Sequence, residues 1–145
     1  MLLPVMALLR RADCVEVIGS ALEGAAAGQG HRVIAGRLEL PPSTVRGWLR
    51  RFASRAELVR TACTALLVAM VADPALPAPS ASALGDAVAA VAALAMAVRR
   101  RFAQALFVGR LALWSLACAL SGGRLLAPAR PGELINTSWL LGAAW

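Results

Sequence analysis

Two adjacent prolines, Pro41 and Pro42, constrain the fold of this chain more than any other feature, because they separate two segments with helical apolar spacing. The residue before a proline is disfavoured in the α-helical region, so the first segment has to end there. Proline is tolerated at the first position of a helix, where its missing N–H is not needed, so Pro42 can begin the second segment. The sequence therefore predicts two helices joined by a tight turn within residues 31–52.

The apolar residues of these helices predict which faces are buried. In the second helix they recur at i, i+3, i+4 and i+7 and form one stripe, consisting of Val45, Trp48, Leu49 and Phe52. In the first helix the residues expected to face inward are Val33, Ile34, Ala35 and Leu38. Ala35 is small enough for the two helices to cross closely, and Leu38 and Leu40 bracket the turn.

An earlier helix is predicted over residues 13–24, where apolar residues again share one face. Asp13 and Glu16 would lie in its first turn, where negative charge is favourable, and Gly24 would end it. Ser54 is a candidate N-cap for a fourth helix that continues through Val71. Three helices thus precede residue 55, and the predicted fold class is all-α.

The stretch IAGRLELPPSTVRGWLRRF, residues 34–52, resembles the homeodomain-like helix-turn-helix segments of transposase helper proteins and small regulators of high-GC bacteria. In that family an IA-x-x-L helix is followed by a recognition helix of the form STVRxWL, and both patterns occur here. The resemblance covers residues 12 to 55. It implies a trihelical domain that binds double-stranded DNA, and an association with a mobile element, as a transposase helper or as a remnant of one.

The chain departs from the family pattern at the turn. The position four residues after Ala35 is usually glycine in this family, because the backbone there often needs a positive φ, and here it is Glu39. A residue other than glycine in that conformation costs about 1 kcal/mol. Either the turn adopts a variant geometry, or the domain carries this cost.

Residues 73–82, DPALPAPSAS, contain three prolines and two serines and predict a semi-rigid linker, the best domain boundary in the chain. An alanine-rich helix is expected from 83 to 105, followed by an apolar segment from 106 to 120 that Gly122 and Gly123 would stop. The predicted divisions are an N-terminal extension (1–11), a helix-turn-helix DNA-binding domain (12–60), a connecting apolar helix (61–72), the linker (73–82), a helical extension (83–121) and an irregular tail (122–145).

The charge of the chain favours a polyanionic partner. The net charge is +7, and all fifteen basic residues are arginines. Residues 31–60 alone hold seven arginines against two glutamates, so most of the excess positive charge lies in the predicted DNA-binding segment. The alternative is that these arginines only form a solvated helix face.

The candidates for DNA contacts in the second helix of the motif point away from its apolar stripe. Arg46 is the first choice for recognising a base, because a guanidinium can pair with both O6 and N7 of guanine, and Arg50 is the next. Ser43 and Thr44, with Pro42 at the helix start, are better placed for phosphate.

The remaining candidates are expected to contact phosphates or to let the DNA approach the helix closely, and not to recognise bases. Gly47 removes side-chain bulk on the face toward DNA, which would allow a close approach of the two backbones. His31, Arg32 and Arg51 are expected to contact phosphates, which adds affinity without sequence preference.

The sequence indicates neither an enzyme nor a metalloprotein. The cysteines Cys14, Cys63 and Cys118 lie far apart and His31 is the only histidine, so no metal site and no cofactor are predicted. We expect the cysteines to be buried free thiols. Eight scattered acidic residues provide no metal-binding constellation for a transposase catalytic core, and no nucleophile arrangement or phosphate-binding glycine loop occurs.

A cytoplasmic, nucleoid-associated protein is expected rather than a membrane protein. A spanning helix needs ~20 successive apolar residues, and the longest charge-free stretches (61–72, 87–98, 111–123 and 134–145) are shorter. The apolar run at the start precedes its arginines, whereas a secretion signal has the opposite order.

Two alternative functions remain open. The first is a small transcriptional regulator whose helical part after residue 55 serves dimerisation or effector binding, and a pocket among those helices would favour it. The second is a basic peripheral membrane protein with residues 83–102 on an anionic surface, although a helix apolar on all sides suits burial better. A homodimer would suit either DNA-binding function, because one three-helix module covers little DNA.

Overall fold

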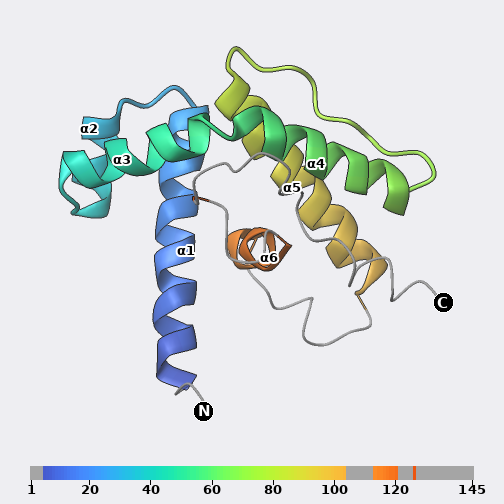
Figure 1. Cartoon of the computed structure of the whole chain (residues 1–145), viewed down its shortest axis with the longest axis horizontal. Helices are drawn as coiled ribbons and strands as arrows, with labels where there is room; N and C mark the ends of the chain where they lie inside the picture. Colours follow the sequence, from blue (N-terminus) through green and yellow to red (C-terminus); the bar gives the residue numbers. More distant parts are fainter. Residues whose placement is uncertain (1–4, 104–112, 121–125, 127–145) are drawn as a thin grey trace.

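A computed structural model describes residues 5–103, 113–120 and 126 of the chain (Figure 1). Within these ranges the protein is built of six helices and no strands, which confirms the predicted all-α class for the described part. The helices are α1 (Val5–Ala26), α2 (His31–Leu38), α3 (Pro42–Ala53), α4 (Ala56–Met70), α5 (Ala83–Arg101) and α6 (Leu113–Leu120). No helix in the described ranges is long and apolar enough to cross a membrane.

The helices α2 and α3 pack beside the C-terminal half of α1 (Figure 1). A small cluster of buried residues joins the three helices, with Ala21 from α1, Ile34 and Ala35 from α2, and Val45 from α3. Trp48 and Leu49 of α3 are half-buried against this cluster. The prediction that the stripe of the second helix faces inward is therefore confirmed, and the two prolines fall where predicted, with Pro42 as the first residue of α3.

The turn between α2 and α3 keeps the left-handed conformation. Glu39 has φ 55° and ψ 40°, and it ends α2 in a Schellman arrangement, in which the Leu40 N–H donates to Ala35 O over 3.0 Å. The alternative of a turn with variant geometry is therefore wrong. A glutamate carries the conformational cost that glycine would avoid.

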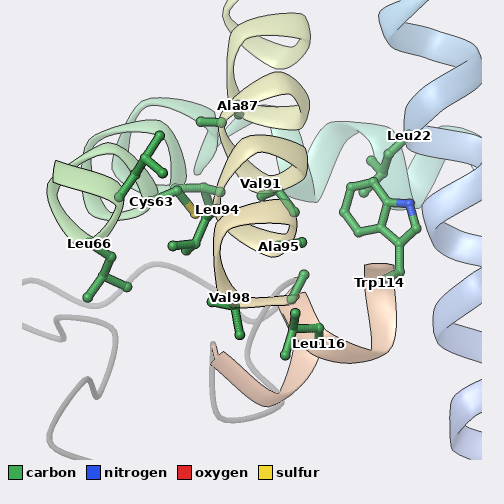
Figure 2. Packing of buried hydrophobic residues seen from close by; sticks show 14 of the residues in the cluster. Leu22, Cys63, Leu66, Ala87, Val91, Leu94, Ala95, Val98, Trp114 and Leu116 are labelled. Atoms are coloured by element: carbon green, nitrogen blue, oxygen red, sulfur yellow. The ribbon is translucent and has the colours of Figure 1, made fainter. Parts of the chain in front are cut away.

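The larger hydrophobic cluster lies around α5, which packs along α4 on one side and meets α6 and α1 on the other (Figure 2). Cys63 and Leu66 reach it from α4, whereas Trp114 and Leu116 reach it from α6. Phe52 of α3 belongs to the same cluster and is fully buried. The linker 73–82 contains no helix, and the elements on both sides of it contribute to this one cluster.

Three polar contacts fasten α6 to α1. The indole Nε1 of Trp114 donates to Glu23 Oε1 over 2.7 Å, and both the backbone N–H and the hydroxyl of Ser115 donate to Glu16 Oε1. Gly19 lies beneath the indole, where a Cβ would be 2.0 Å from Trp114 Cδ1. A glycine is needed there because the ring rests on the backbone of α1.

The first helix differs from its prediction at both ends. It begins at Val5, because the alanines, leucines and arginines that precede Asp13 are good helix formers. Asp13 and Glu16 therefore do not lie in its first turn. It also continues past Gly24 to Ala26. Gly24 is buried, and a Cβ there would lie 2.9 Å from Arg37 Nη2, so the glycine serves a close approach of α2 rather than a helix end.

Two further residues depart from prediction. Val33 is 64% exposed, because it points to the side of α2 opposite Ala35. Ser54 does not cap α4: its hydroxyl donates back to Arg51 O over 2.8 Å, and Arg55 occupies the N-cap position. The α5 helix, which ends at Arg101 rather than 105, does have a serine cap, because Ser82 Oγ accepts from the Gly85 N–H. The predicted stop at Gly122 and Gly123 lies outside the described residues.

Candidate nucleic-acid interface

An open groove of about 430 Å³ runs between the start of α2 and the solvent face of α3. We call it the α2–α3 groove. Its lining residues are His31, Arg32, Pro42, Ser43, Arg46, Gly47 and Arg50. All seven are among the nine residues that the sequence proposed for DNA contact, so the fold brings together side chains from two helices that a turn separates.

The helical repeat of α3 explains why these residues share one face. Ser43, Arg46, Gly47 and Arg50 follow the spacing i, i+3, i+4 and i+7. The opposite face carries Val45, which is fully buried in the small cluster. Because the stripe that contains Val45 is buried, the stripe that contains Arg46 and Arg50 faces solvent. His31 and Arg32 of α2 line the same groove.

Thr44 and Arg51 lie apart from the groove lining. Thr44 is half-buried in the first turn of α3, where its N–H donates to Pro41 O over 3.0 Å. Arg51 is exposed beside Arg50. The predicted phosphate contacts of these two residues stay predictions.

The arginines of the described chain differ in whether they have partners. Several of those outside the groove are bound within the protein: Arg37 Nη2 donates to Ser20 O over 3.0 Å, Arg60 forms an ion pair with Glu57, and Arg101 donates to Met70 O at the end of α4. Arg55 and Arg99 also have interactions within the protein. By contrast, the guanidinium groups of Arg32, Arg46 and Arg50 have no hydrogen bond or ion pair with a described residue.

The charged side chains that line the groove in the described structure are all positive. No carboxylate is among its lining residues in the described structure, and Arg46 and Arg50 are exposed. Both helices that border it begin there without a side-chain cap, at Gly30 and Pro41. Because free N–H groups at a helix start favour an anion, the backbone adds to the attraction of the arginines.

Gly47 has no packing reason within the described protein. A Cβ built there would meet no described atom within 4 Å. The glycine nevertheless costs about 1 kcal/mol of helix stability relative to alanine. The open space at Gly47 leaves room for a molecule to approach the backbone of α3 from outside.

Sequence reasoning missed the residues that hold the groove in shape. Arg37 ties α2 to α1 through Ser20, and Gly24 allows the two helices to approach. A glycine inside a helical pattern is the signal that could have pointed to this close packing.

A second concavity, which we call the α4–α5 pocket, has a volume of about 600 Å³. Its walls are mostly apolar and include Ala93 and Met96, and its charged lining residues are Asp73, Arg100 and Arg101. Met96 is 51% exposed. This pocket is lined by the helices that the regulator alternative assigns to an effector region.

The cysteines whose side chains the structure describes, Cys63 and Cys118, form no disulfide bond. Cys63 is buried and free, and burial raises the pKa of its thiol to about 12. Cys118 is half-buried and also free of disulfides, whereas the Cys14 side chain lies outside the described residues. No group of three histidine, cysteine or carboxylate side chains that could hold a metal occurs in the described part of the chain.

Comparison with known proteins assigns no family. No family model matches the sequence, and no curated protein or solved structure is significantly similar to it. The functional argument therefore rests on the residues and the geometry of the α2–α3 groove.

Proposed function

We propose that this chain binds double-stranded DNA in a sequence-specific manner, with α1, α2 and α3 as a trihelical helix-turn-helix module and α3 as its recognition helix. An α-helix fits the major groove of B-DNA, and a helix presented with one buried and one polar face can enter it. The module would be the DNA-binding part of a protein associated with a mobile element, a role that rests on the sequence resemblance.

One observation carries the proposal, namely the set of arginines that line the α2–α3 groove. A solvated helix face would hold charges of both signs or arginines paired to neighbours. Three arginines without partners among the described residues line the α2–α3 groove, and no carboxylate lines it with them. Arg37, Arg60 and Arg101 elsewhere are bound within the protein, whereas Arg51 and Arg100 are exposed and have no such partner in the described part of the chain. Such a groove attracts phosphates and keeps its donors available for base edges.

The test is fluorescence anisotropy of the purified chain with a pool of random duplexes over a series of salt concentrations. We expect the affinity to fall steeply with salt, because bound arginines release counterions. The double variant Arg46→Ala with Arg50→Ala should bind much more weakly. The matched control is Arg60→Ala with Arg100→Ala, which removes the same charge outside the groove.

The outcomes separate the functions. Equal loss in both double variants would mean that net charge alone attracts DNA, and the groove would not be the interface. No binding at low salt by a folded protein would overturn the proposal. Binding to anionic vesicles instead of duplexes would favour the membrane alternative.

The α4–α5 pocket supports a second candidate function, a small helix-turn-helix regulator that responds to an apolar ligand. Its volume of about 600 Å³ lies within the range of small-molecule sites, and mostly apolar walls with two arginines against one aspartate, Arg100, Arg101 and Asp73, suit an apolar anion. Anilinonaphthalene sulfonate is a suitable probe. Saturable binding of this probe that Ala93→Trp abolishes, together with a change in DNA affinity when the probe is bound, would favour a regulator over a transposase helper.

A homodimer, measured by light scattering, would suit both the regulator and the transposase helper.

A further inference from the structure

The α2–α3 groove also indicates which base it would recognise, an inference that rests on the proposed DNA binding. Its lining contains arginine, histidine, serine, proline and glycine, and no asparagine, glutamine, aspartate or glutamate. Adenine is read in the major groove by a side chain that both accepts and donates, and the cytosine amino group by an acceptor. The long side chains of this groove are donors.

Guanine is the base that matches such a lining. It presents two acceptors, O6 and N7, on its major-groove edge, and a guanidinium can donate to both at once. Arg46 and Arg50 are exposed on the same face of α3 and have no partner among the described residues. Each is therefore available for one guanine.

The spacing of the two arginines limits the distance between the guanines. Four residues of α-helix rise about 6 Å. Two base-pair steps rise about 6.8 Å, since one step is ~3.4 Å. Gly47, between the two arginines in sequence and on the same groove, leaves open space for the DNA to approach closely enough for both to reach.

We infer that Arg46 and Arg50 determine specificity by reading two guanines that lie within three consecutive base pairs, one guanine for each guanidinium. The two guanines lie on the same strand or on opposite strands. Arg32 and His31, at the edge that α2 supplies, contact the flanking phosphates and set the register of α3 on the duplex.

The experiment begins with duplexes selected from a random pool by the full chain. Each guanine of the selected site is then replaced, one at a time, by 7-deazaguanine, which lacks the N7 acceptor and keeps Watson–Crick pairing. We expect two positions within three base pairs at which this replacement weakens binding by roughly five- to tenfold, the lower part of the range for one bidentate pair. Other guanines should be insensitive.

The variants assign each position to an arginine. In Arg46→Ala one of the two sensitive positions should become insensitive to 7-deazaguanine, and in Arg50→Ala the other should. Arg46→Lys keeps the charge and a donor that can still reach O6 or N7 but loses the planar pair, so it should retain the salt dependence and show a reduced sensitivity at the same position. Circular dichroism verifies that the variants are folded, which their exposed positions favour.

The failure of this inference is distinguishable from failure of the proposed function. Selected sites without a guanine pair, or 7-deaza sensitivity that persists in both alanine variants, would overturn the inference while salt-dependent duplex binding upheld the function. Absence of duplex binding would overturn both.

Discussion

The substitution Gly47→Ala tests whether DNA approaches the backbone of α3. Gly47 lies inside α3, and an added Cβ would meet no described atom within 4 Å, so the methyl group enters open space. Replacing glycine by alanine in a helix interior stabilises it by about 0.8–1.0 kcal/mol. For a chain of this size that gain raises the melting temperature by about 3 °C.

The same methyl group should weaken DNA binding. If the DNA packs against the groove at Gly47, an extra carbon in a close contact costs about 1–3 kcal/mol, which is at least a fivefold loss of affinity. A variant that is more stable and yet binds less tightly separates a contact with DNA from an effect on folding. Thermal unfolding by circular dichroism and duplex anisotropy measure the two quantities.

Gly36→Ala is the matched control. Gly36 is an exposed glycine of α2, an added Cβ there also meets no described atom, and it does not line the groove. It should stabilise the protein by a similar or smaller amount, because it lies in the last turn of its helix, and leave DNA affinity unchanged. Unchanged affinity in Gly47→Ala, or an equal loss in Gly36→Ala, would refute the reasoning.

Four further predictions follow from single residues. Glu39→Gly should raise the free energy of unfolding in urea by about 1 kcal/mol, because glycine fits the observed φ of 55°, whereas Glu39→Ala should give no gain. Gly19→Ala should lower it by about 1–3 kcal/mol, because the new Cβ collides with Trp114, and an unchanged midpoint would contradict that packing. Arg32→Ala should reduce the slope of log affinity against log salt by about 0.9, one phosphate contact, for every duplex alike. Because burial raises the pKa of Cys63 to about 12, iodoacetamide at pH 8 should label Cys63 only in denaturant, which peptide mass spectrometry detects.

The sequence predicted the structure best where local chemistry decides it. The proline pair placed the turn and the first residue of α3, because proline restricts the backbone whatever its surroundings. The stripe that contains Val45 and Phe52 predicted the buried face, and the arginines of the groove followed as its complement. At Glu39 the sequence left two alternatives open, a variant turn or a strained one, and the observed positive φ decides between them.

The failures concern residues whose surroundings come from distant parts of the chain. Glu16 was assigned to a helix start, yet its carboxylate accepts from Ser115, almost a hundred positions later. Gly24 resembled a stop signal, and only the approach of α2 shows why it is glycine. Local propensity cannot distinguish a glycine that ends a helix from one that lets another helix approach.

The position of α3 in the core bears directly on how well it could recognise DNA. Val45 anchors it in the small cluster, Phe52 anchors it in the larger one, and Leu49 packs against both. Helix α3 is thus held from two sides, so the proposed binding of DNA would require the ordering of side chains rather than of the helix. Each arginine that becomes ordered costs about 0.5–1.5 kcal/mol, comparable with what one good base contact contributes. A flexible helix would add a backbone cost to this, so in the proposed complex the double anchoring of α3 would let two exposed arginines give net specificity.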